Sequence, residues 1–167
     1  YPRCVRLVTA TTRTMRPDEV DGVDYHFFSQ ERFDSELSQG TIGEHRYVPE
    51  LGTHYGIYIP ALETLITKGH IIFAQVDIDG ARFLKEKYRA TTIFIMPESL
   101  EQFRGRLRTR NPEWSAKEFD ARMKGTDREM RVHAPEDDFR VVNADGKLKE
   151  TIEEVVAIMR KEGYTFS

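Results

Sequence analysis

Short apolar runs alternate with amphipathic stretches along the chain, and this alternation predicts strands and helices in turn. Two of the runs, 70–77 and 91–96, are almost continuously apolar, which is typical of strands buried on both faces of a parallel sheet. The remaining strand-like runs are short and rich in β-branched and aromatic residues. We expect strands at 5–9, 25–28, 42–48, 54–59, 70–77, 91–96 and 139–143.

Capping residues and glycines mark the ends of the helices between these runs. Ser29 is placed to cap a helix that Gly40 stops, and the run Ser115-Ala-Lys-Glu118 has the spacing of a capping box. A proline in the first helical turn, as at Pro60, needs no backbone donor there. We expect helices at 30–38, from Pro60 to Gly69, at 98–109, from Ser115 onward, and at 147–161.

Strands that alternate with helices favour an α/β fold in layers around a mainly parallel sheet. The 167 residues match the usual size of one domain and can bury about two thirds of the unfolded surface. We therefore expect a single domain over 1–167, without internal repeats.

Composition narrows the function classes. One cysteine, Cys4, excludes an intramolecular disulfide, and the chain has neither a signal peptide nor a long apolar run, so we expect a cytoplasmic protein that does not enter a membrane. The net charge of −3 argues against nucleic acid as a partner. Arginines nevertheless outnumber lysines 17 to 8, which is consistent with a need for forked hydrogen-bond donors.

The segment from Thr11 to Tyr25 has the character of a phosphate receptor. Arg13 and Arg16 carry planar guanidinium groups that can hold phosphate oxygens in pairs, and the Tyr25 hydroxyl can donate a further bond to the same anion. A Pro-Asp and Asp-Gly turn series lies between them. The alternative is a solvated basic loop between two strands.

Polar residues follow several of the expected strands, at the edge where α/β sheets bind ligands. Thr9 ends the first strand, Asp77 and Asp79 end the strand at 70–77, and Asn143 ends the last one. Asp77 is placed either to order Mg²⁺ and its waters or to cap a helix, and the sequence leaves both open.

A second arginine cluster occupies 104–110. Arg106 and Arg110 are four residues apart and therefore share one helix face, while the break at 111–115 returns the chain toward Arg122. Two helices joined in this way could close over a polyphosphate as a lid. The alternative is a charged helix surface that faces solvent.

Taken together, these motifs resemble those of the guanylate kinase family over nearly the whole chain. The resemblance is carried by Thr11-Thr-Arg-x-x-Arg-Pro-x-Glu-x-Asp-Gly-x-Asp-Tyr25, Ile42-Gly-Glu44, Tyr55-Gly56, Asp77-x-x-Gly80, Arg106-Leu-x-x-Arg110 and Val142-Asn143. It implies a three-layer α/β/α fold with a parallel central sheet, a small β-rich GMP-binding region at 9–59 and a helical lid at 104–131.

The same resemblance implies roles for individual residues. Arg13, Arg16, Tyr25 and Tyr55 would hold the phosphate of GMP, Glu44 would read the guanine edge, and Thr9 would touch the base. Asp77 would lie beside the nucleotides and Mg²⁺, which the nucleotide phosphates would mainly hold, so no metal site made by the protein alone is expected. Arg106, Arg110 and Arg122 would act from the lid, and Asn143 would approach the adenine of ATP. Of these, the expected catalytic residues are Arg13, Asp77, Arg106, Arg110 and Arg122.

The chemistry of the residues agrees with these roles. Guanine offers two adjacent N–H donors that one carboxylate can accept, and a buried acceptor left unpaired discriminates by roughly 10⁴. Without the surrounding motif, Glu44 would be a surface carboxylate on a strand. Phosphoryl transfer needs no protein nucleophile, because positioning and positive charge suffice, and the five histidines show no metal-ligand spacing.

Two departures from the family pattern bear on activity. The printed sequence holds no G-x-x-x-x-G-K-[ST] phosphate loop, so we expect an N-terminal strand and loop to be absent from this chain and its ATP site to be incomplete. Ile57 stands where a small hydroxyl residue is expected after Tyr55-Gly56, which removes one guanine contact worth about 1 kcal/mol.

Two functions remain from the sequence. The first is an ATP-dependent kinase that converts GMP to GDP, with GMP and ATP as its partners. The second is an inactive module of the same fold whose GMP pocket binds a phosphopeptide or protein. Arg106, Arg110, Arg122 and Asn143 favour the kinase, since a binding module does not need them. The oligomeric state stays open.

Overall fold

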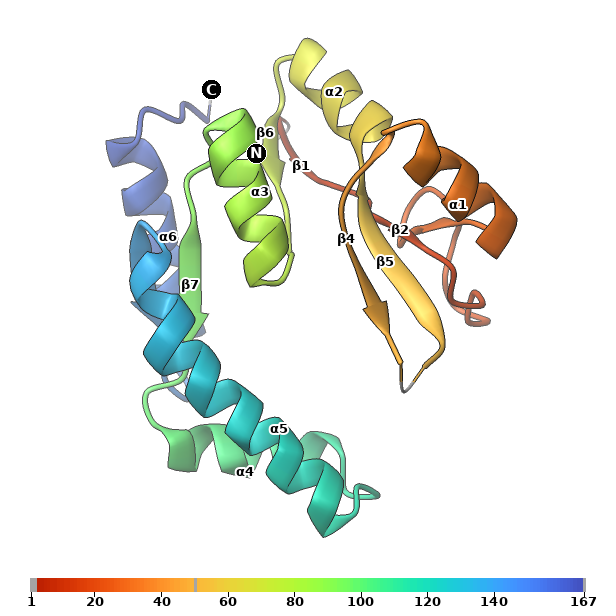
Figure 1. Cartoon of the computed structure of the whole chain (residues 1–167). Helices are drawn as coiled ribbons and strands as arrows, with labels where there is room; N and C mark the ends of the chain where they lie inside the picture. The colour runs from red at the N-terminus through yellow and green to blue at the C-terminus, as the bar shows by residue number, and fades with distance from the viewer. Residues whose placement is uncertain (1–2, 50, 167) are drawn as a thin grey trace. The chain divides into compact units, whose positions relative to one another are not determined.

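The computed structural model describes residues 3–49 and 51–166 (Figure 1). Contacts within the chain group these residues into two compact units. The first holds the described residues up to Ala90 together with Phe166, and the second spans Thr91–Thr165. Glu50, within the expected hairpin turn, and Tyr1 and Pro2 lie outside the described residues.

Two sheets form the first unit. In one, strands β1 (Cys4–Arg6) and β6 (Ile71–Phe73) pair in parallel. The other has the order β3-β2-β5-β4, with β2 and β3 parallel and the remaining pairs antiparallel. Its strands are β2 (Ala10–Thr11), β3 (His26–Phe27), β4 (Ile42–Val48) and β5 (Thr53–Tyr58).

Three helices complete this unit, and each begins at a residue that favours a helix start. Helix α1 (Gln30–Ser38) is capped by the Ser29 hydroxyl, and α2 (Ile59–Thr67) has Pro60 in its first turn. Helix α3 (Ile78–Tyr88) is capped by the Asp77 carboxylate, which accepts a hydrogen bond from the Gly80 amide at 3.1 Å.

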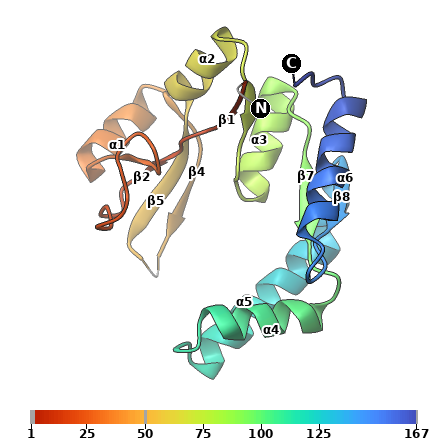
Figure 2. The same ribbon diagram turned by 180° about the vertical axis from the view of Figure 1, so that it is seen from behind.

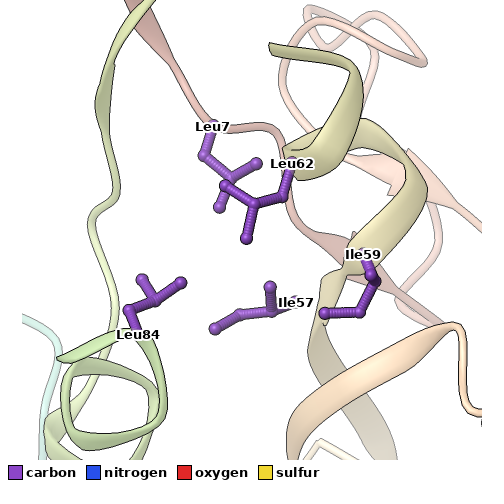
Figure 3. Packing of buried hydrophobic residues seen from close by; sticks show 5 residues of the cluster. All are labelled: Leu7, Ile57, Ile59, Leu62 and Leu84. Atoms are coloured by element: carbon purple, nitrogen blue, oxygen red, sulfur yellow. The ribbon is translucent and has the colours of Figure 1, made fainter. Parts of the chain in front are cut away.

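Apolar side chains hold the elements of the first unit together in two clusters. Figure 3 shows the larger one, in which Leu7, Ile57, Ile59, Leu62 and Leu84 point toward one another from β5, α2, α3 and the segment after β1. The smaller cluster joins α1 to the four-stranded sheet and consists of Ala10, Phe28, Phe33 and Ile42. Burial of such side chains stabilises the fold by about 1.5–3 kcal/mol each.

The second unit has a parallel strand pair and three α-helices, which Figure 2 shows from behind. Strands β7 (Ile93–Met96) and β8 (Phe139–Val142) pair over their full length. Helices α4 (Leu100–Arg110) and α5 (Ala116–Arg128) pack through Leu107, Phe119 and Met123. A short π-helix, η1 (Glu129–His133), and a 3-10 helix, η2 (Ala134–Glu136), lead to β8, and α6 (Leu148–Lys161) follows it.

The structure confirms several predicted elements. Strand 42–48 and helix 30–38 have the expected bounds, and the capping box of α5 forms, since the Ser115 hydroxyl and the Glu118 carboxylate each accept a backbone hydrogen bond. Arg106 and Arg110 lie on one helix, which is joined to the helix of Arg122 by a short polar link.

Two strand predictions, at 70–77 and at 5–9, are wrong at their ends. The strand expected at 70–77 stops at Phe73 because its partner β1 pairs only through Cys4–Arg6. Strand β1 therefore ends before Thr9, which lies in the link to β2. Asp77 and Asp79 do not end a strand either, because Asp77 caps helix α3 and Asp79 lies in its first turn. This helix was not predicted from the sequence.

The α/β class is confirmed, since each unit combines a parallel strand pair with helices. Among the residues the structure describes, no helix is long and apolar enough to cross a membrane.

Candidate functional site

Arg13 is held in place by two hydrogen-bond acceptors and two aromatic rings. Its Nη2 donates to Glu19 Oε1 at 2.6 Å and its Nη1 donates to the Thr14 carbonyl at 2.8 Å. The guanidinium also lies over the rings of Tyr25 and Phe27, at 5.5 and 5.7 Å from their centroids. These contacts preorganise Arg13 before any ligand binds.

Glu19 connects the two arginines of the motif. One of its carboxylate oxygens binds the Arg13 side chain, and the other accepts a hydrogen bond from the Arg16 backbone amide at 2.8 Å. The hydrogen bond from Arg13, followed by that from the Arg16 backbone, lowers the pKa of Glu19, and Glu19 in turn raises the pKa of Arg13. Glu19 therefore stays ionised and fixes the turn that presents Arg16.

The acidic residues of the following turn are structural. Asp21 accepts a hydrogen bond from the Phe27 amide, and Asp24 accepts one from the Val20 amide, each at 2.8 Å. Such side-chain acceptors replace backbone partners in tight turns. The turn places the Tyr25 ring edge-on to the Tyr55 ring, with centroids 5.9 Å apart.

A β-bulge orients Glu44. Ile42 pairs with Tyr58 and His45 with Gly56, so Gly43 and Glu44 together oppose the single residue Ile57. Gly43 leaves space for a neighbouring ring at this bulge, because a Cβ atom there would lie 2.6 Å from the Phe83 ring and would force that ring to shift. The bulge breaks the alternation of β4 and turns Glu44 toward the first turn of α3.

The start of α3, where the Glu44 carboxylate lies, is closely packed around Gly80 and Val76. A Cβ atom on Gly80 would lie 2.8 Å from Val76 Cβ and 3.4 Å from Glu44 Oε2. The carboxylate is half-buried against this turn. Burial first, and then the charges of Asp77 and Asp79, raise the pKa of Glu44 from 4.5 to about 7, whereas Arg46 acts in the opposite direction.

Asp77 has both of its carboxylate oxygens engaged. Oδ1 caps α3, and Oδ2 forms an ion pair with Arg46 Nη1 at 3.4 Å. The helix-cap interpretation of Asp77 is therefore confirmed. The described residues contain no group of three or more histidine, cysteine or acidic side chains that could hold a metal ion.

Ile57 is turned away from the site. Its side chain is 1% exposed and lies in the cluster with Leu7 and Leu84. Thr9 is half-buried in the link between β1 and β2, where its carbonyl accepts a hydrogen bond from the His26 amide.

In the second unit, a cavity of about 400 Å³ lies at the carboxyl ends of β7 and β8. Arg106, Arg110 and Asn143 line it together with apolar side chains, among them Ile95 and Phe103. The cavity therefore brings together three of the four residues that the sequence assigned to the ATP side. An apolar wall with a few polar groups suits a flat aromatic ring.

Arg106 is fixed at the edge of this cavity. Its Nε and Nη2 donate to Asp145 Oδ1 at 2.8 and 2.6 Å, and Nη2 also donates to the Asn143 carbonyl at 2.9 Å. The Asn143 amide donates to the Met96 carbonyl, which keeps the end of β8 against β7. Arg122 does not line the cavity. It lies on α5, with Nη1 3.7 Å from Glu129 Oε1.

The structure thus divides the predicted site residues between the units. Thr9, Arg13, Arg16, Tyr25, Glu44, Tyr55 and Asp77 belong to the first, and Arg106, Arg110, Arg122 and Asn143 belong to the second.

No role was predicted from the sequence for three residues that form hydrogen bonds or ion pairs with predicted site residues. Glu19 stands three residues after Arg16, within the quoted motif, and that spacing was the available signal. Arg46 and Asp145 had no such signal, because their partners Asp77 and Arg106 lie 31 and 39 positions away.

An α/β framework with paired arginines and tyrosines on one unit, and an arginine-lined cavity at strand ends on the other, is compatible with the class of nucleoside-monophosphate kinases. Comparison with known proteins narrows this class. The family model for guanylate kinase matches residues 3–162. The guanylate kinase of Chlorobaculum tepidum is 38% identical over 140 residues, which is 83% of this chain and 70% of the relative.

Two further matches are also guanylate kinases. The guanylate kinase of Lactococcus lactis is 33% identical over 94% of this chain and 74% of its own length. A crystal structure of guanylate kinase from Anaplasma phagocytophilum superposes with a TM-score of 0.74 at 32% identity, covering 98% of this chain and 78% of that one. The chain belongs to the guanylate kinase family.

Proposed function

We propose that the protein transfers a phosphoryl group from ATP to GMP, which yields ADP and GDP. Family membership supports this activity, and the observation that carries the choice of acceptor is the placement of Glu44. The bulge in β4 directs its carboxylate to the first turn of α3, where its two oxygens would accept two N–H donors from a guanine edge.

The acceptor phosphate is proposed to bind at Arg13 and Arg16, with hydroxyl donors from Tyr25 and Tyr55. Arg13 is already oriented by Glu19, so little side-chain ordering is needed when the anion arrives. Thr9 is proposed to lie at the base. Because Ile57 is buried in the apolar core, no hydroxyl from that position contributes to guanine recognition.

The donor side is proposed to use the cavity of the second unit. Asn143 would contact the adenine, and Arg106, Arg110 and Arg122 would neutralise charge on the phosphates during transfer. The apolar part of the cavity wall suits adenine, and Arg106 is fixed by Asp145 at its edge.

Mg²⁺ fits this arrangement as an ion held mainly by the nucleotide phosphates. Magnesium usually keeps several waters and takes one or two carboxylates together with substrate phosphates. Asp77 offers a carboxylate at the start of α3, although both of its oxygens have partners in the free protein. When bound, the ion would neutralise phosphate charge in the transition state. A cytoplasmic location stays a prediction.

Calorimetry tests the acceptor assignment. We expect GMP to bind, AMP to bind much more weakly, and Arg16→Ala to weaken GMP binding by about ten- to a hundredfold, as expected for hydrogen bonds between charged groups. Arg32→Ala, on α1, is a matched control that should change little. Equal affinity for GMP and AMP would contradict the assignment.

Transfer is tested by GDP formation from ATP, GMP and Mg²⁺. Because the printed sequence holds no phosphate loop, the assay uses a chain in which such a segment precedes Tyr1. Arg110→Ala and Arg122→Ala should lower kcat with little change in GMP affinity. A folded chain that binds GMP but forms no GDP would contradict the kinase proposal and support a binding module.

A further inference from the structure

Arg46 occupies a position on the GMP-binding unit to which the preceding proposal gives no role. It lies on β4 directly opposite Tyr55 of β5, and Tyr55 in turn lies opposite Thr11 of β2. Residues opposite each other in an antiparallel pair share one face of the sheet, with Cβ atoms about 4.5–5.5 Å apart. Arg46 and the proposed phosphate-binding Tyr55 are therefore neighbours.

The face that carries them is the one turned away from α1. His45 and His54, the preceding residues on the two strands, contact the ring of Phe33 on α1, with ring centroids 6.3 and 5.2 Å away. Because side chains alternate along a strand, Arg46 and Tyr55 point to the opposite face. Arg46 also follows Glu44 by two residues, so it stands between the proposed base reader and the proposed phosphate site.

The charges around Arg46 favour a further cation at this position. Arg13 is already neutralised by Glu19, at 2.6 Å with both side chains largely buried. The acidic groups Glu44, Asp77 and Asp79 act on one another at the start of α3, so a phosphate that carries nearly two negative charges would be repelled there. A further cation on this face would offset that repulsion.

The present partner of Arg46 does not hold it firmly. Its ion pair with Asp77 is 3.4 Å long, and the Arg46 side chain is 64% exposed. Exposed pairs of this kind contribute about 0–1 kcal/mol, so the guanidinium can exchange one acceptor for another at little cost.

We infer that Arg46 is a third phosphate-binding arginine, which leaves Asp77 when a nucleoside monophosphate binds and donates to its phosphate oxygens. This inference rests on the proposed function, because it requires the acceptor nucleotide to lie between Glu44 and Tyr55. Release of Asp77 from Arg46 would also free one carboxylate oxygen beside the phosphates.

The experiment compares GMP with guanosine, which presents the same base without a phosphate. Calorimetry is carried out on the unaltered protein and on Arg46→Gln, with circular dichroism to confirm folding. At a pH well above about 7, where Glu44 is ionised with or without Arg46, we expect Arg46→Gln to weaken GMP binding by about ten- to a hundredfold and to leave guanosine binding unchanged within about twofold. Arg46→Lys keeps the charge without the planar fork and should give an intermediate loss.

Arg32→Gln is the matched control. Arg32 is 54% exposed, is paired with Glu36 at 3.6 Å, and lies on α1, whose Phe33 covers the other face of the sheet. The Arg32→Gln variant should bind GMP as tightly as the unaltered protein does.

Two results would overturn the inference. Unchanged GMP binding by Arg46→Gln would show that Arg46 does not reach the nucleotide. An equal loss of GMP and guanosine affinity would show that it acts on the base reader and not on the phosphate. Failure of the unaltered protein to bind GMP would contradict the proposed function itself. The experiment therefore distinguishes a failure of the proposed function from a failure of the inference about Arg46.

Discussion

Replacement of Glu44 by glutamine should stabilise the free protein while it abolishes guanine recognition. In the folded protein, burial and the charges of Asp77 and Asp79 raise the pKa of Glu44 to about 7, compared with an ordinary value of 4.5. A raised pKa means that the folded state prefers the protonated carboxyl. The contribution of this group to stability is therefore complete below about pH 4.5 and is lost as the pH rises through about 7.

The size of the effect follows from the same two values. A difference between 4.5 and about 7 corresponds to about 3 kcal/mol at 1.4 kcal/mol per pKa unit. The carboxylate is only half-buried, and solvent screening lowers this to about 1–2 kcal/mol. Glutamine resembles the protonated carboxyl in shape and charge, so Glu44→Gln should be more stable than the unaltered protein by that amount at pH 8, and the difference should shrink toward zero as the pH falls below about 4.5.

Urea unfolding at pH 5, 6, 7 and 8 measures this difference. Glu86→Gln, which removes an exposed carboxylate from α3, is the control. If Glu44→Gln were less stable than the unaltered protein at pH 8, or if the difference did not depend on pH, the claim that like charges and burial act on Glu44 would be refuted.

Binding should show the opposite trend. Guanine requires the ionised carboxylate, so affinity for guanosine should fall as the pH drops below about 7, by up to tenfold per pH unit. Guanosine is the better probe here because the phosphate of GMP itself titrates near about pH 6. Glu44→Gln should bind guanosine weakly at every pH, and calorimetry over the same pH series provides the comparison.

Further predictions concern the residues that support the site. Glu19→Ala should weaken GMP binding about tenfold in calorimetry, since the Arg13 side chain and the Arg16 backbone both lose the acceptor that orients them, and the stability of the unaltered protein should fall when the pH drops far enough to protonate Glu19. Gly80→Ala should destabilise the protein by about 1–3 kcal/mol in urea unfolding, because its Cβ would lie 2.8 Å from Val76 Cβ. Gly105→Ala, on α4 with nothing within 4 Å, should instead stabilise it by about 0.5–1 kcal/mol. Asp145→Asn should raise the KM for ATP severalfold without changing GMP affinity, because it loosens Arg106 at the cavity edge.

Much of the fold could be predicted because the signals are local. Helix α1 follows from the Ser29 cap and the Gly40 stop, and helix α5 from its capping box, since each is a matter of hydrogen bonds within a few residues. The strand at 70–77 was overestimated for the opposite reason. An apolar run shows that a segment is buried but not how far a neighbouring strand pairs with it, and here the pairing ends at Phe73.

The candidate site shows the same division. Arg13, Arg16 and Tyr25 lie within one short stretch, so the sequence alone could predict that they act together. Their roles in binding stay predictions, as do the boundaries of the proposed regions and the single-domain organisation. Glu19 was also within reach of sequence reasoning, since a carboxylate three residues after an arginine in a turn can accept its backbone hydrogen bond.

The sequence by itself determined the class of the protein, because capping residues, apolar periodicity and clustered arginines each depend on neighbours along the chain. Only the tertiary structure decided that Glu44 turns toward α3 through a bulge and that Gly43 and Gly80 leave space for neighbouring side chains there. It also paired Arg46 with Asp77. These features depend on contacts between residues far apart in sequence, and neither the local hydrogen-bond pattern nor hydrophobic periodicity encodes such distances.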